Sequence, residues 1–199
     1  ALDDPDATVE ELREVARSIV ESTDRTERLL DGLLLLALST QGTRRDEPLA
    51  LDAVVRRGAA AVAAEAAEAG VALRLDLQPA RVRGDEVLIE RVAANLAENA
   101  VRYGRPGGVA RVGVREDTEG AVLTVTSDGD VIAPADLDRL GQPFERLRRE
   151  RARGTGLGLS IVRAVAEAHG GRLRLAAPAS GGLVAEVRLP PAAAAVTGA

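Results

Sequence analysis

Two asparagines, Asn95 and Asn99, stand four residues apart in the segment NLAEN, and this spacing puts both side chains on one face of a helix expected over residues 86–103. Asparagine is a poor residue for a helix interior, so a pair on one stripe indicates a site. An amide oxygen is a hard, neutral ligand that suits Mg²⁺ beside waters and phosphate oxygens. A buried hydrogen-bond network is the alternative, and for the pair taken alone it is the commoner role.

One helical turn later come Arg102 and Tyr103. A guanidinium group can bind a phosphate through two hydrogen bonds at once, and a tyrosine ring offers a flat face for a base. The alternative for Tyr103 is an ordinary half-buried core aromatic. It is one of only two aromatic residues in the chain, which favours the site.

The segment TSDGDVIAP, residues 126–134, forms a glycine turn at the end of a predicted strand. Gly129 permits a tight turn or a close approach of the backbone to a ligand. Asp128 could accept a hydrogen bond from the amino group of a base. A plain Asp-Gly turn is the alternative and, for this segment in isolation, the favoured one.

A second glycine segment, RGTGLGLS at residues 153–160, precedes a predicted helix. Its three glycines leave backbone N–H groups at the positive end of a helix dipole, which is a suitable cradle for phosphate. The arginine-rich run at 146–153 comes just before it. A nucleic-acid patch disagrees with the acidic chain, so a mobile lid over a polyphosphate is the more economical interpretation.

Composition excludes several kinds of site. The 199 residues include no cysteine and no lysine, and His169 is the single histidine. Thiolate chemistry, metal sites built on several imidazoles and the phosphate-binding lysine of P-loop proteins are therefore ruled out. The net charge of −5 argues against a protein that coats DNA, and no apolar run reaches the ~18 residues of a membrane span.

The elements that must position these residues can be predicted from periodicity. A long helix over 7–39 carries a heptad seam of Val9, Leu12, Ala16, Ile19, Thr23, Thr26, Leu30, Leu33 and Ala37. A polar linker at 42–48 and an α+β region at 49–190 follow. That region is expected to be a two-layer sandwich, its strands largely antiparallel and its helices on one face. Helices are predicted at 50–69, 86–103, 134–141 and 157–169, strands at 71–77, 81–83, 109–116, 121–127, 171–177 and 183–190, and a disordered tail at 191–199.

The order of these motifs resembles the N, first-glycine, F and second-glycine boxes of sensor histidine kinases, with QPFERL as the F box. Those kinases belong to the ATP-binding superfamily of DNA gyrase, Hsp90 and the mismatch-repair ATPases. The resemblance covers residues 49–190 and implies the Bergerat-type ATP-binding fold. It implies that residues 1–41 hold the second helix of a dimerisation and phosphoacceptor bundle, the first helix being absent.

The resemblance also implies roles for single residues. Asn99 would ligate Mg²⁺, Asn95 would support the metal and the phosphates, and Arg102 would contact phosphate; Asn95 and Arg102 are the expected catalytic residues. Tyr103 would line the adenine pocket, and Phe144 would anchor the lid. The full set of expected nucleotide-binding residues is Asn95, Asn99, Arg102, Tyr103, Ser127, Asp128, Gly129, Phe144, Gly154, Thr155, Gly156, Leu157 and Gly158.

The first glycine box departs from the family pattern Asp-x-Gly-x-Gly. Ser127 stands where an adenine-reading aspartate is expected, and Val131 replaces the second glycine. Neighbouring residues of a strand point to opposite faces, so Asp128 can substitute only if the turn shifts by one residue. Otherwise Ser127 or a water must bind the adenine amino group.

The predicted function is the catalytic region of a sensor histidine kinase. The superfamily's ATPases carry glutamate where this chain has Asn95, and an amide cannot take a proton from water. The expected reaction is transfer of the γ-phosphate of Mg²⁺-ATP to a histidine on the absent helix. The alternatives are an ATPase of the same superfamily, a serine-kinase relative, and a non-catalytic scaffold or degenerate kinase with weak ATP binding.

The expected partners are a second copy through the bundle helix and a response regulator, with no nucleic acid. The resemblance implies a membrane receptor whose cytoplasmic portion includes this chain, attached to the membrane only through missing segments. His169 lies in the AHGG end of the last helix, where a structural role is expected.

Overall fold

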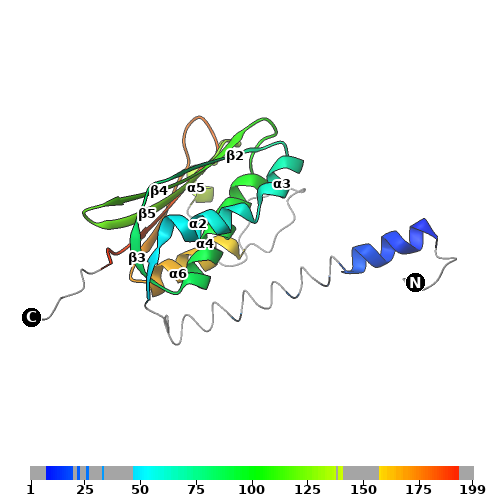
Figure 1. Ribbon diagram of the computed structural model, residues 1–199. Helices are drawn as coiled ribbons and strands as arrows, with labels where there is room; N and C mark the ends of the chain where they lie inside the picture. Colours follow the sequence, from blue (N-terminus) through cyan, green and yellow to red (C-terminus); the bar gives the residue numbers. More distant parts are fainter. Residues whose placement is uncertain are drawn as a thin grey trace, which may run out of the picture.

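The computed structural model describes residues 8–19, 22, 26, 33, 47–137, 139–140 and 157–192. Residues 9–19 form a helix, drawn in blue in Figure 1, and residues 22, 26 and 33 are also helical. Thr8 begins this helix with a capping box: Glu11 N–H donates to Thr8 Oγ1 over 3.3 Å, and Thr8 N–H donates to Glu11 Oε2 over 2.8 Å. The seam residues Val9, Leu12, Ile19 and Leu33 are exposed.

A five-stranded sheet forms one layer of the second region. In spatial order it contains β2 (Ala72–Leu77), β4 (Val109–Asp117), β5 (Gly120–Ser127), β7 (Leu183–Leu189) and β6 (Arg172–Ala176). The β4–β5, β5–β7 and β6–β7 pairs are antiparallel, as the short connections predict, whereas β2 pairs with β4 in parallel. A parallel pair needs a long crossover, which here contains a strand and the longest helix of the region.

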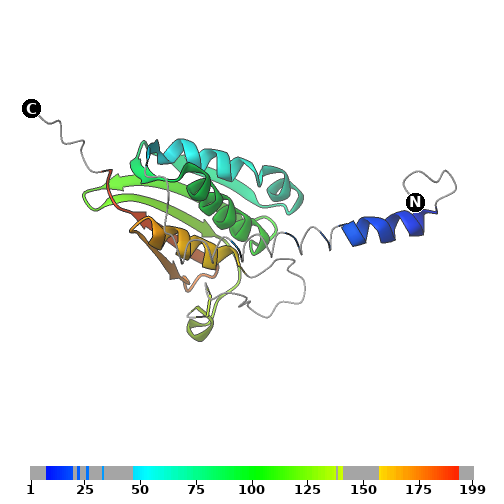
Figure 2. The same ribbon diagram turned by 90° about the horizontal axis from the view of Figure 1, so that it is seen from below.

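Helices cover one face of this sheet. Figures 1 and 2 show three long helices side by side on it: α2 (Leu51–Ala60), α4 (Glu86–Arg102) and α6 (Gly158–Ala168). This second region also contains the short helices α3 (Ala63–Glu68) and α5 (Pro134–Leu137). Within the described residues, none of the helices has the length and apolar character that crossing a membrane requires.

The core lies between the two layers and consists almost entirely of aliphatic side chains. Alternate residues of β4 and β5 face the helices, for example Val112 and Leu123, and α4 presents Ile89 and Leu96 to them. Burying each large aliphatic side chain contributes ~1.5–3 kcal/mol. This packing fixes α4 and α6 against the sheet.

Two local predictions were wrong. The helix predicted over 50–69 is divided at Ala61 and Val62, where the backbone of Val62 (φ −99°, ψ 5°) leaves the helical conformation. Both α2 and α3 contact α4 and β2. Glu47 and Pro48, which the sequence placed in the linker, belong to β1 (Glu47–Ala50), which pairs antiparallel with β3 (Arg81–Gly84). A proline is tolerated in β1 because an edge strand needs no N–H donor on its open side.

His169 joins the end of α6 to the start of α4. Its imidazole Nε2 accepts a hydrogen bond from Asp85 N–H over 3.0 Å, and its Nδ1 bonds to the carbonyl of Val165 over 2.7 Å. Asp85 in turn caps α4, its Oδ1 accepting from the N–H groups of Val87 and Leu88. The ring is buried and its nitrogens are engaged, as a structural role requires.

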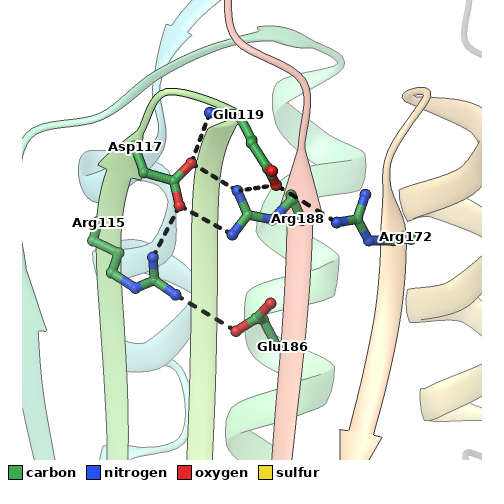
Figure 3. A network of polar contacts seen from close by, with 6 residues as sticks. All are labelled: Arg115, Asp117, Glu119, Arg172, Glu186 and Arg188. Atoms are coloured by element: carbon green, nitrogen blue, oxygen red, sulfur yellow. Dashed lines mark hydrogen bonds and ion pairs between the residues drawn. The ribbon is translucent and has the colours of Figure 1, made fainter.

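A network of ion pairs lies on the sheet face that carries no helix (Figure 3). Arg188 donates through both Nη atoms to Asp117, over 2.7 and 3.0 Å, and Arg115 donates to the same carboxylate over 3.1 Å. The Arg188 hydrogen bonds, followed by that from Glu119 N–H, lower the pKa of Asp117 to about 2. The β4–β5 hairpin is thereby tied to β7.

Replacing His169 tests the contact between α6 and α4. His169→Leu fills the space but removes the acceptor for Asp85 N–H, so we expect the free energy of unfolding to fall by ~1–3 kcal/mol in urea titrations. His169→Gln keeps an acceptor on a side chain of similar reach and should lose less. Equal losses in the two variants would contradict the assigned hydrogen bond.

The Asp117 network predicts a dependence of stability on pH. The folded pKa of Asp117 is about 2 against an ordinary value of 3.8, so its contribution is complete above pH ~4 and is lost as the pH falls through about 2. The difference in unfolding free energy between the parent chain and Asp117→Asn should be constant from pH 7 to 5 and shrink between pH 4 and 2. Asp76→Asn, an exposed carboxylate of β2, serves as the control. A difference that stayed constant down to pH 2 would contradict the network.

Candidate functional site

Asn95 connects α4 to the first turn of α6. Its side chain is 4% exposed, and its Nδ2 donates to the carbonyl oxygen of Gly158 over 3.4 Å. The contact holds the N-terminus of α6 against the middle of α4. Of the two roles that the sequence left open for the asparagine pair, Asn95 has the one in a buried hydrogen-bond network.

Asn99 lies one helical turn further along α4 and also faces Gly158. A Cβ atom added to Gly158 would lie 3.3 Å from Asn99 Nδ2 and 3.9 Å from its Oδ1. The Asn99 side chain is half-buried and forms no hydrogen bond within the described part of the chain. Its amide is therefore available to a ligand that enters beside α6.

The N-terminus of α6 lacks the usual compensation of its dipole. Within the described residues no side chain caps it, and its first turn holds no acidic residue. Leu157, just before it, is fully buried, and Ser160 donates its hydroxyl to the Leu157 carbonyl over 2.8 Å. The partial positive charge of this helix end therefore lies beside Asn99, where it favours an anion.

Arg102 and Tyr103 end α4 and face different neighbours. An Nη atom of Arg102 lies 3.9 Å from Glu65 of α3, a loose and partly exposed ion pair. Tyr103 is 38% exposed, and its carbonyl oxygen lies so close to Gly129 that a Cβ there would be 2.9 Å away. The structure therefore brings the turn after β5 against the end of α4.

Ser127 and Asp128 lie on opposite faces of the sheet. The antiparallel register pairs Ser127 with Ala110, whose side chain faces the helices, and the Ser127 hydroxyl accepts from Leu183 N–H over 3.3 Å. The Asp128 carboxylate accepts from Val109 N–H over 3.1 Å and from Arg111 over 3.2 Å. The hydrogen bond from Val109 N–H, and after it the one from Arg111, lowers the pKa of Asp128.

The one-residue shift that the sequence allowed for this turn is therefore not present. The register continues unbroken to the end of β5, so that Ser127, and not Asp128, lies on the face of the sheet that the helices cover. Asp128 was expected among the nucleotide-binding residues, but its carboxylate is held on the other side of the strand by Val109 and Arg111.

Gly181 and Gly182 support the same turn, and the sequence reasoning missed them. Both have positive φ, 92° and 85°, and a Cβ on either would overlap the backbone of Gly129 or Ser127. Gly182 N–H donates to the Asp130 carbonyl over 2.9 Å. The two consecutive glycines between β6 and β7 indicate backbone with positive φ, but such a pair is equally typical of an ordinary hairpin loop, so it did not point to the turn after β5.

Four predicted site residues, Phe144, Gly154, Thr155 and Gly156, lie outside the described residues. Among the described ones, the structure brings together Asn95, Asn99, Leu157 and Gly158 at the start of α6, and Tyr103, Ser127 and Gly129 at the end of β5.

A family match identifies the fold that positions these residues. Residues 84–193 match the family described as "Histidine kinase-, DNA gyrase B-, and HSP90-like ATPase". The chain belongs to this ATPase family. The match covers the asparagine helix, the end of β5 and the whole of α6, and it confirms the two-layer α+β ATP-binding fold and the resemblance to histidine kinases.

Relatives of this ATPase-family chain are sensor proteins. It is 42% identical over 193 residues to the sensor protein CutS of Streptomyces coelicolor, covering 95% of this chain and 46% of CutS. It is 31% identical over 189 residues to the sensor protein QseC of Escherichia coli K12, covering 93% of this chain and 40% of QseC. The chain thus spans less than half the length of these curated relatives.

Solved histidine kinases share its architecture. The mycobacterial sensor histidine kinase MprB is 29% identical with a TM-score of 0.66, over 74% of this chain and 98% of that one. Full-length ShkA, solved in complex with AMPPNP, is 23% identical with a TM-score of 0.79, over 95% of this chain and 40% of that one, and supports the fold.

The two asparagines should differ in their effect on stability. Asn95→Ala removes a buried hydrogen bond and leaves the Gly158 carbonyl without that partner, so we expect the free energy of unfolding to fall by ~1–3 kcal/mol. Asn99→Ala breaks no hydrogen bond within the described chain and places a better helix former in α4, so its stability should stay within ~0.5 kcal/mol of the parent. Chemical denaturation of both variants measures this, and an equal loss for Asn99→Ala would show that its amide is structurally committed.

Proposed function

We propose that this chain binds Mg²⁺-ATP between α4 and α6 and is the catalytic region of a sensor histidine kinase. The observation that carries the proposal is the Asn99 amide, which no described residue engages, beside an α6 N-terminus that no described side chain caps. Membership of an ATPase family that includes histidine kinases, and relatives that are sensor proteins, support it.

The residues present fit such a ligand. Mg²⁺ prefers oxygen donors and keeps waters and phosphate oxygens, so one amide oxygen from Asn99 suffices as a protein ligand. Backbone N–H groups at the start of α6 would hold phosphate, and Gly158 lacks the side chain that would fill the space beside Asn99. Tyr103 and Ser127 would border the base.

Arg102 is proposed to reach the phosphates. Its present pair with Glu65 is 3.9 Å long and partly exposed, and such pairs contribute little, so the guanidinium can exchange a carboxylate for a phosphate at small cost. Phe144, Gly154, Thr155 and Gly156 are proposed to form the lid. Positioning and charge neutralisation would then supply most of the catalysis.

The bound nucleotide supplies an activated phosphoryl group, and the protein decides which nucleophile receives it. Asn95 bears no group that accepts a proton, and its amide nitrogen already donates to the Gly158 carbonyl. Water at this position would therefore not be activated by the side chain. We infer that the acceptor is a histidine on a helix that this chain does not contain.

The proposed setting is two-component signalling. The exposed apolar residues Val9, Leu12 and Ile19 of the N-terminal helix are suited to a helical bundle with a second copy. The phosphoryl group would pass on to a response regulator, and the whole protein would be a membrane receptor with this part on the cytoplasmic side. A scaffold with weak ATP binding is the second candidate, because the Asp128 carboxylate is turned away from the base end.

Nucleotide titration tests the metal assignment. With a non-hydrolysable ATP analogue, calorimetry should show Mg²⁺-dependent binding, and Asn99→Ala should weaken it roughly 10- to 100-fold because a metal ligand is lost. Val87→Ala, an exposed position on the same helix, should leave it unchanged. Unaltered affinity in Asn99→Ala would contradict the role given to this residue.

Phosphoryl transfer is measured separately, by mixing the chain with a phosphoacceptor helix bundle and labelled ATP. We expect acid-labile, base-stable label on the bundle, because phosphohistidine behaves in this way. Steady release of phosphate without any acceptor would indicate an ATPase, and an absence of nucleotide binding would favour the scaffold.

A further inference from the structure

Ser127 is a buried polar residue at the end of β5, on the side where the nucleotide base would lie. We propose that this site accepts adenine and guanine nucleoside triphosphates with little discrimination, because a hydroxyl and not a carboxylate faces the base. The inference rests on the proposed function, since it concerns the base end of the same nucleotide site.

The direction in which a nucleotide can extend follows from the contacts between α4 and α6. On the side toward the start of α4, Asn95 Nδ2 donates to the Gly158 carbonyl and joins the two helices. Asn99 is at the phosphate end, and Tyr103 lies four residues, or ~6 Å, further along the helix axis. The Tyr103 carbonyl lies against Gly129. A nucleotide held at Asn99 therefore extends toward the turn that contains Ser127.

The hydrogen-bonding capacity of Ser127 suits either purine. A serine hydroxyl has one donor and two acceptor positions, and Leu183 N–H occupies one acceptor position. One donor and one acceptor remain. The hydroxyl can accept from the N6 amino group of adenine or donate to the O6 atom of guanine. An ionised carboxylate only accepts, so it would leave guanine O6 unpaired and facing a negative charge.

The structure offers no route for Asp128 to replace Ser127. Its carboxylate is held on the opposite face by Val109 N–H and Arg111. A shift of the turn would also drive its backbone into Gly181 and Gly182, which already pack so closely that a single added Cβ would overlap it. Asp130, the other carboxylate of the turn, is exposed.

The test compares non-hydrolysable analogues of ATP and GTP, each with Mg²⁺, by calorimetry on the whole chain. We expect the two dissociation constants to lie within about tenfold of each other. Ser127→Asp should raise the preference for the ATP analogue by roughly 10- to 100-fold, because guanine O6 then meets an acceptor that cannot donate. The matched control is Thr126→Asp, which adds the same charge to the same strand but on the face of Arg111, and it should leave the ratio unchanged.

If Ser127→Asp fails to fold, Ser127→Ala tests the role of the hydroxyl instead. Loss of a hydroxyl that serves both bases should weaken both analogues by similar factors and leave their ratio near that of the parent. Binding of the ATP analogue more than about 100-fold tighter than the GTP analogue by the parent chain would overturn this inference and leave the proposed function standing. Binding of neither analogue would overturn the proposed function and this inference with it.

Discussion

The packing of α6 against α4, with the 3.4 Å contact from Asn95 Nδ2 to the Gly158 carbonyl where they meet, places the start of α6 beside Asn99, and the site depends on this arrangement. At the other end of α6, His169 accepts from Asp85, the residue that caps α4. Each helix is thus fastened to the other at both ends of α6. Because the helices are also packed on the sheet, the free amide of Asn99 and the positive end of the α6 dipole are held beside each other before any ligand arrives.

The two faces of the sheet carry different kinds of side chain, charged on the open face and mainly aliphatic on the face that the helices cover. On the open face, Arg115 and Arg188 both donate to Asp117 and tie the strands together (Figure 3). On the helix face, the strands present aliphatic side chains and, at the end of β5, the hydroxyl of Ser127. Strand alternation alone separates Ser127 from Asp128, so one residue of register determines whether a hydroxyl or a carboxylate borders the site.

Sequence periodicity was sufficient for the elements whose structure is set locally. The 3.6-residue pattern placed α4 and α6, and alternation placed β4 and β5, within one or two residues of their observed bounds. Periodicity did not predict features that depend on contacts with segments distant in the sequence. The parallel pairing of β2 with β4 and the pairing of β1 with β3 depend on segments far along the chain. Gly181 and Gly182 were missed for the same reason: their φ values are needed only because the turn after β5 packs on them.

Asn95 and Asn99 lie on successive turns of α4 but differ in their contacts. The sequence allowed either a buried hydrogen-bond network or a metal site. The structure gives the network to Asn95, whereas the Asn99 amide has no hydrogen bond to any residue that the structure describes. A glutamate at position 95 would place an ionised carboxylate against the Gly158 carbonyl, two acceptors with no proton between them. The amide that cannot activate water is thus also the group that holds α6 in place. Conversion of this site to hydrolysis would therefore lose the contact between position 95 and the Gly158 carbonyl when it gained a carboxylate on α4.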